Sequence, residues 1–185
     1  RIKSANFAYL PLAHLAPKLQ EIMDLKSVLG LRSPINTFTR MMNPFDAPYS
    51  IQSIFHPNYR EIHRDAEKIL GQPQMCVFKG EGGEIERRPG KPVVVESLIG
   101  GEYIDEEWPA LLPGGHARED ENLSLERLGA VWAGTETDAY AIASITGTAA
   151  IALRLMGRAA TPGKADAMAR AMWETRSKER PRAAA

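Results

Sequence analysis

The residues with the clearest chemical potential lie in segment 79–88, which combines glycines, glutamates and cations. Its glycines permit sharp backbone turns, and Glu81, Glu84 and Glu86 carry the hard oxygen atoms that magnesium prefers. The segment has neither the Gly-Lys-Ser/Thr ending of a P-loop nor the GxGxxG spacing of a dinucleotide site. Two interpretations stay open, a loop that holds phosphate and magnesium or an ordinary solvated turn.

Six basic residues are candidate ligands for phosphate. Clustered cations beside strand ends suit the phosphate of a nucleotide or of a nucleic-acid backbone. The candidates come from the first quarter of the chain and from segment 79–88: Lys26, Arg32, Arg40, Lys79, Arg87 and Arg88. We expect them to line one edge of a sheet, and the alternative is scattered surface charge.

Covalent catalysis and a histidine metal pair have no support in the sequence. The histidines are scattered, and His56 and His63 are seven positions apart, too far for an adjacent pair of metal ligands. The sequence has no Gly-x-Ser-x-Gly motif. Cys76, the single cysteine, lies in an apolar stretch and is predicted to be a core residue rather than a reactive thiolate. One cysteine excludes internal disulfides and cysteine-based zinc sites, and suits a cytoplasmic protein.

The composition is that of a globular protein. Of the 185 residues, 44% are hydrophobic and 25% are charged, and no run approaches the roughly 18 apolar residues that a membrane span requires. A net charge of zero argues against a uniformly basic nucleic-acid binder. The charge is uneven, because residues 91–126 hold two basic and nine acidic residues. The last basic cluster is interpreted as a solvated helix face that runs into a frayed tail, with a basic binding surface as the alternative. Its members are Arg170, Arg176, Lys178, Arg180 and Arg182.

Strands and helices alternate in the predicted order of elements. Apolar stretches, periodicity and glycine or proline breaks predict strands at residues 6–11, 50–55 and 74–78 and helices at 14–29, 37–42 and 58–70. Short connections between alternating elements favour an α/β fold, a mainly parallel central sheet flanked by helices. Ligands commonly bind beyond the carboxyl ends of such strands, which is where segment 79–88 begins.

The second half of the chain predicts a hairpin and three helices. Residues 93–98 and 102–104 flank Gly100 and Gly101, the pattern of a β-hairpin with a glycine turn. Helices are predicted at 124–133, 139–155 and 164–180, the middle one buried. We expect a single α/β domain over residues 1–180 and a disordered tail at 181–185.

Several segments together resemble the second half of the anthranilate phosphoribosyltransferase family, glycosyltransferase family 3. They are FAYL at 7–10, HLAP at 14–17, LGLRSPIN at 29–36 and NP at 43–44, while TAAIAL at 148–153 is similar to the family's Asn-Ala-Ala helix. Residues 29–37, 52–57 and 78–84 look more specifically like the YbiB branch. The resemblance implies the carboxyl-terminal α/β domain of the nucleoside phosphorylase and phosphoribosyltransferase type of fold. It also implies that the amino-terminal helical domain and the glycine-rich loops lie upstream of Arg1, so we expect a fragment.

The departures from the family concern its substrate and metal sites. The transferases carry an Asp-Glu pair for magnesium, and Gly83 and Glu84 stand at that place here, so only Glu84 is a candidate metal ligand. Lys26 stands where the family uses an arginine to hold anthranilate, and a lysine does not reproduce a planar bidentate grip on a carboxylate. The resemblance therefore implies that this chain alone does not catalyse the transfer.

Three functional hypotheses follow. The first, implied by the resemblance to YbiB, is non-specific binding of DNA or RNA through phosphate contacts, without a required cofactor, by a cytoplasmic homodimer that assembles through the missing amino-terminal part. The second is a phosphoribosyltransferase that places magnesium and phosphoribosyl pyrophosphate at residues 80–86. The third is a fragment with no independent activity. No membrane partner is expected in any of them.

Overall fold

The computed structural model of the chain describes residues 7–31, 34–80, 84–115 and 124–179. The chain divides into two compact units, residues 1–47 with 181–185 and residues 48–180. Each unit is treated below by itself. The single domain over residues 1–180 and the disordered tail at 181–185 stay predictions, and residues 180–185 lie outside the described part of the chain.

The larger unit is built on a four-stranded sheet in the order β1-β2-β3-β4. The strands are β1 (Tyr49–Ile54), β2 (Gln74–Lys79), β3 (Val93–Ile99) and β4 (Glu102–Trp108). Only β1 and β2 pair in parallel, while β2 with β3 and β3 with β4 are antiparallel, so the sheet is mixed rather than mainly parallel. The predicted hairpin is confirmed, and positive φ angles of 59° and 88° at Gly100 and Gly101 explain why glycine occupies its turn.

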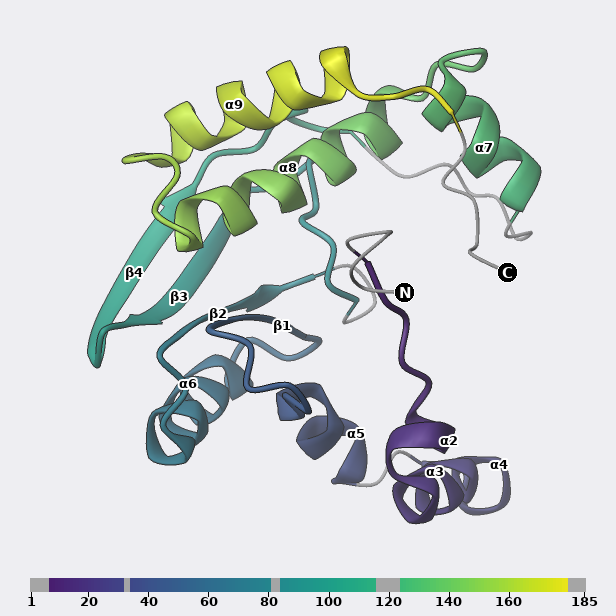
Figure 1. Ribbon diagram of the computed structural model, residues 1–185, viewed down its shortest axis with the longest axis vertical. Helices are drawn as coiled ribbons and strands as arrows, with labels where there is room; N and C mark the ends of the chain where they lie inside the picture. The colour runs from purple at the N-terminus through teal and green to yellow at the C-terminus, as the bar shows by residue number, and fades with distance from the viewer. Residues whose placement is uncertain (1–6, 32–33, 81–83, 116–123, 180–185) are drawn as a thin grey trace. The chain divides into compact units, whose positions relative to one another are not determined.

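Helices cover both faces of this sheet, which confirms the α/β class (Figure 1). Helix α6 (Tyr59–Leu70) lies on one face, and α8 (Ala139–Leu155) lies on the other with α9 (Pro162–Thr175) beside it. Helix α7 (Leu125–Ala133) precedes α8, and the sequence predicted α6, α7 and α8 to within one residue at each end. Helix α9 was predicted over 164–180, but it ends at Thr175, and residues 176–179 are not helical. No helix in the described residues has the length and apolar character needed to cross a membrane.

The two faces of the sheet differ in chemistry because alternate strand residues point in opposite directions. Cys76 and Phe78 of β2 belong to a core with Trp108 and with Ala150 and Ile151 of α8. Met75 and Val77 belong to the opposite face, with Ile54 and Leu98. Cys76 is 1% exposed, which confirms its predicted position in the core, and burial raises the pKa of its thiol to about 12.

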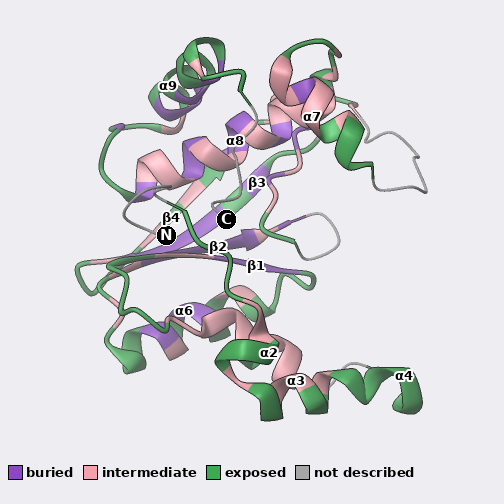
Figure 2. Ribbon diagram, turned by 45° about the vertical axis from the view of Figure 1, so that its right-hand side comes forward, coloured by how far each residue is buried: buried purple, intermediate pink, exposed green. Residues whose placement is uncertain are grey.

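Helix α6 buries His63, Arg64 and Glu67 and leaves Ile62, Ile69 and Leu70 exposed. Figure 2 colours buried and exposed stretches of this helix. Gln52 of β1 donates a hydrogen bond to Glu67, and its amide oxygen lies 2.7 Å from His63 Nδ1. Arg60 and Arg64 pair with Glu96 of β3. Ion pairs and hydrogen bonds therefore join α6 to the sheet where an apolar seam would be expected.

The smaller unit consists of short helices over its described residues. They are α2 (Leu12–Leu15), α3 (Pro17–Asp24), α4 (Lys26–Leu29), α5 (Ile35–Phe38) and a 3-10 turn at Thr39–Met41. The single helix predicted over 14–29 is thus divided, because Pro17 starts a new helix instead of continuing one. The strand predicted at 6–11 is wrong, since residues 7–10 pair with no strand and Phe7 and Tyr9 are 73% and 79% exposed.

Candidate phosphate and nucleic-acid interface

The candidate site of the larger unit lies at the carboxyl ends of the parallel strands β1 and β2. The register pairs Ile54 with Lys79, so both strands end at the same edge of the sheet. The chain continues there as residues 55–58 towards α6 and as residues 80–92 towards β3. This is the edge at which the sequence placed the ligand-carrying loop, although the sheet around it is mixed.

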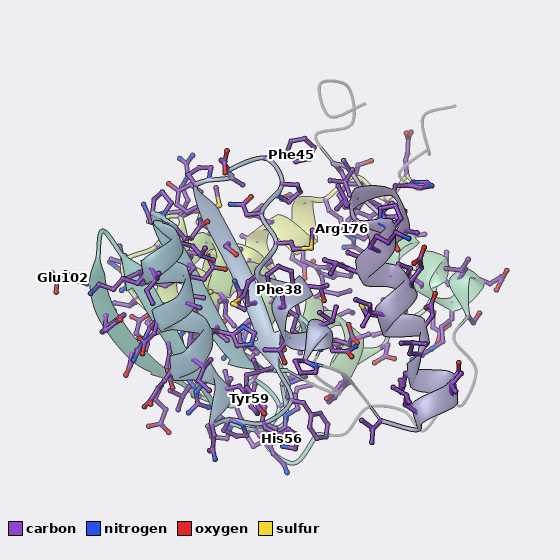
Figure 3. The ribbon with its side chains drawn as sticks, turned by 90° about the horizontal axis from the view of Figure 1, so that it is seen from below. Phe38, Phe45, His56, Tyr59, Glu102 and Arg176 are labelled. Atoms are coloured by element: carbon purple, nitrogen blue, oxygen red, sulfur yellow. The ribbon has the colours of Figure 1, made fainter. Side chains whose placement is uncertain are left out.

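Lys79 and three exposed rings meet at this edge. The Nζ atom of Lys79 lies 5.9 Å from the ring centroid of Phe55. The rings of Phe55 and His56 meet edge to face with centroids 4.8 Å apart, and His56 and Tyr59 follow at 6.3 Å. Figure 3 shows His56 and Tyr59 beside one another. A cation and aromatic faces that water can reach form a surface suited to phosphate and to bases.

Gly80 lets the chain turn away from β2 close to β1. Its backbone N–H donates to Ser53 Oγ at 3.1 Å. A Cβ atom at this position would lie 1.8 Å from the carbonyl oxygen of Glu84, a contact that only backbone movement could relieve. The predicted role of glycine in a sharp turn is therefore confirmed at Gly80, whereas Gly82 and Gly83 lie outside the described residues.

Arg87 is buried, unlike the surface cation expected from the sequence. Its Nη1 lies 2.6 Å from Asp166 Oδ1 of α9, and its Nη2 donates to the Pro109 carbonyl at 2.7 Å. The guanidinium also lies 4.8 Å from the ring of Trp108. Desolvation lowers the pKa of Arg87, and the carboxylate of Asp166 opposes that effect. We therefore assign Arg87 to holding the segment in place rather than to contact with a ligand.

Helix α8 also contacts this segment. The backbone N–H of Arg87 donates to Thr148 Oγ1 at 2.9 Å. The hydroxyl of Ser144 lies 2.6 Å from Glu86 Oε1 and 3.1 Å from the carbonyl oxygen of Arg87. A Cβ atom at Gly147 would lie 3.0 Å from Arg87 Cδ, so glycine in α8 allows the close approach.

The other predicted cations divide between the two units. Arg88 is half-buried and belongs with Lys79 to the larger unit. Lys26 is exposed at the start of α4 and Arg40 is half-buried in the 3-10 turn, both in the smaller unit. Arg32 lies outside the described residues. A single surface made from all of these cations stays a prediction.

The predicted magnesium ligand Glu84 is exposed at the carboxyl edge of the sheet. No group of three histidine, cysteine or acidic side chains in the described part of the chain is arranged to hold a metal ion. Glu81 and Gly83 lie outside those residues, and Glu86 is engaged with Ser144. Glu84 therefore fits only a magnesium ion whose other ligands come mainly from a substrate phosphate and water.

The sequence analysis missed the aromatic part of this edge. It used Phe55 and His56 for the resemblance of residues 52–57 and weighed His56 as a metal ligand, but it did not consider the rings of Phe55, His56 and Tyr59 as a binding surface. The signal was present in the stretch from Phe55 to Tyr59, where two aromatic residues flank a His-Pro-Asn sequence between a strand and a helix. Aromatic residues that follow a strand end are exposed unless a neighbouring element covers them.

Comparison with models of known protein families gives no match. An uncharacterized protein of Aquifex aeolicus is 34% identical over 91 residues, 49% of this chain and 29% of that protein. Anthranilate phosphoribosyltransferases of Polynucleobacter necessarius and Burkholderia mallei are 30% identical over 96 and 102 residues. These matches cover 52% and 55% of this chain but only 28% and 29% of the relatives. The similarity to anthranilate phosphoribosyltransferases is thus confirmed over about half of the chain, and the YbiB branch stays a prediction.

Proposed function

We propose that this chain is the α/β part of a YbiB-like, anthranilate phosphoribosyltransferase-related protein that binds nucleic acid non-specifically through phosphate contacts. The observation that carries the proposal is the placement of Lys79 at the carboxyl end of a parallel strand pair, beside rings that are open to solvent. Phosphate contacts hold any sequence equally, because the backbone has the same charge throughout.

Of the six predicted cations, we assign to this function the four that the structure describes as exposed or half-buried. They are Lys26 and Arg40 in the smaller unit and Lys79 and Arg88 in the larger one. Arg32 joins them on the sequence pattern alone. We further propose that the whole protein is a cytoplasmic homodimer that needs no cofactor for this binding.

The test is a titration of the chain with a labelled single strand and a labelled duplex at about 50 mM and about 200 mM salt. Lys79→Glu is expected to weaken binding at every sequence and to lower the slope of log affinity against log salt by about 1. Lys164→Glu, the same change at an exposed lysine of α9, is the matched control and should bind like wild type. Equal losses in both variants would remove Lys79 from the site and leave only net charge as the cause.

A second candidate is a magnesium-dependent phosphoribosyltransferase, and the similarity to anthranilate phosphoribosyltransferases favours it. In that function Glu84 would hold magnesium, which neutralises the charge of a departing pyrophosphate. Lys79 and Arg88 would bind phosphate, while Lys26 would stand in the place of the carboxylate-binding arginine. Calorimetric titration with phosphoribosyl pyrophosphate and magnesium separates the two functions. Heat that Glu84→Gln abolishes, with no affinity for oligonucleotides, would support the enzyme and overturn the first proposal.

A further inference from the structure

We infer that Phe55, His56 and Tyr59 form an aromatic platform on which unpaired bases stack, while Lys79 contacts a neighbouring phosphate. The inference rests on the proposed binding of nucleic acid. It adds that this edge of the sheet prefers single-stranded nucleic acid to a duplex. In a duplex the faces of the bases are already stacked on one another, so they are not available to a protein ring.

The first support is the exposure of large rings beside a cation. Phe55 is 49% exposed and Tyr59 is 43% exposed, and His56 between them is also exposed. Neighbouring ring centroids are 4.8 Å and 6.3 Å apart with interplanar angles of 84° and 42°, so the three rings offer faces of different orientation to separate bases. The Lys79 ammonium is 5.9 Å from the Phe55 centroid. No described carboxylate forms an ion pair with Lys79, so its charge is available to an anion.

The second support is that the rings stand on a rigid frame. Phe55 directly follows Ile54, which is buried at the end of β1, and Tyr59 is the first residue of α6. Arg60, next to Tyr59, pairs with Glu96 of β3 and fixes the start of that helix to the sheet. Rings held in place in this way lose little conformational freedom when a base stacks on them.

Stacking also fits a binder without sequence preference. Every base has a π-face, so an aromatic ring accepts all four with modest differences, whereas hydrogen bonds to base edges would select among them. The cation supplies the salt-dependent part of the affinity and the rings supply a part that salt screens little. Together they distinguish a single strand from a duplex without reading its sequence.

Tyr103 shows what a ring with a structural role looks like in the same unit. Its hydroxyl donates to Asp65 Oδ1 at 2.7 Å, and the side chains of Arg64 and Lys68 lie over its ring at 4.2 Å and 4.4 Å. In the sheet, Tyr103 pairs with Leu98, and Leu98 pairs with Met75 near the start of β2. Lys79 is at the other end of β2, so Tyr103 lies towards the opposite end of the sheet from Lys79. Tyr103 is therefore a matched control for loss of an exposed ring.

The experiment compares three probes of equal length, about 15 nucleotides: oligothymidine, an abasic strand with the same phosphates, and a duplex. Wild type is expected to bind oligothymidine about tenfold or more tightly than the abasic strand, because bases that stack on the rings add affinity that an abasic strand lacks. The Phe55→Leu/Tyr59→Leu double variant should lose this difference and keep its affinity for the abasic strand. Phe55→Trp/Tyr59→Trp should restore the difference, and Tyr103→Leu should behave like wild type. Circular dichroism and thermal unfolding check that each variant is folded.

The outcomes separate stacking from phosphate binding. If wild type binds oligothymidine and the abasic strand equally, with the same salt dependence, phosphate binding stands and the platform is overturned. If both leucine substitutions leave the preference for oligothymidine intact, the preference arises elsewhere and the platform is again overturned. If no probe binds, the proposed function fails and the platform fails with it.

Discussion

At the scale of single residues, burial changes the acid-base behaviour of Glu67. It lies on the sheet side of α6, almost fully buried, and accepts a hydrogen bond from Gln52. Desolvation raises the pKa of the Glu67 carboxyl above its ordinary value of 4.5, and the hydrogen bond from Gln52 partly opposes the rise. His63 is the other titratable group that meets Gln52, on its amide oxygen.

The pH dependence of stability follows from the raised pKa of Glu67. Because the folded pKa of Glu67 is raised, its favourable contribution is complete below about pH 4.5 and is lost as the pH rises through the folded pKa. Glu67→Gln keeps an acceptor for Gln52 and carries no charge. We expect the variant to gain in free energy of unfolding relative to wild type as the pH rises from about 4.5 to about 8.

The measurement is urea unfolding of both proteins at those two pH values. Glu61→Gln, at an exposed position of the same helix, serves as the control and should track wild type. A difference between Glu67→Gln and wild type that stays constant with pH would show that burial does not govern this carboxyl.

Among the elements, the segment that returns from β2 is held to two helices by a buried arginine. Arg87 joins Asp166 of α9, and the backbone around it joins Ser144 and Thr148 of α8. The ion pair closes a contact between residues 79 positions apart. The candidate loop is therefore positioned by α8 and α9 as well as by the strand that precedes it.

Removing one partner of the Arg87–Asp166 ion pair should lower the free energy of unfolding. Arg87→Met leaves the carboxylate of Asp166 nearly buried without its partner, and we expect a loss of about 3–5 kcal/mol in the free energy of unfolding. Arg87→Met/Asp166→Leu should lose less than the two single changes together, with a coupling of about 0.5–3 kcal/mol. Denaturant unfolding of the four proteins measures the coupling, and Lys164→Met on the same helix should change stability by less than about 0.5 kcal/mol. Additive losses would mean that the two side chains act separately.

At the scale of the whole molecule, the two units differ in how much core they contain. The larger unit holds the two apolar clusters on either side of its sheet. In the smaller unit no described residue is buried, and Val28, Leu29 and Leu31 are among its exposed apolar side chains. A unit without buried side chains does not offset the conformational entropy that folding removes.

We therefore expect residues 48–179 to fold without the preceding segment. A chain of these residues should unfold cooperatively in urea with native-like circular dichroism, whereas a peptide of residues 7–47 should show little helix, since its helices have at most eight residues. The comparison also tests the prediction of one domain over residues 1–180. A cooperative transition in the peptide, or none in residues 48–179, would contradict the expectation.

Most elements of the larger unit could be predicted from the sequence alone. Apolar periodicity and glycine or proline breaks predicted β1, β2, the hairpin and helices α6 to α9, because these signals depend on neighbouring residues. The strand predicted at 6–11 failed because an apolar run does not by itself provide a pairing partner. The sequence also predicted the sharp turn at Gly80 and the core position of Cys76.

The surroundings of the functional residues could not be predicted, because they depend on the tertiary structure. The direction of β3, the burial of Arg87 and the polar inner side of α6 each depend on partners far along the chain, such as Asp166 and Glu96. The arrangement of the rings of Phe55, His56 and Tyr59 depends on the turn from β1 into α6 and on the exposure of this edge of the sheet. The residue type limits which contacts a side chain can make, and the tertiary structure determines which of those contacts form.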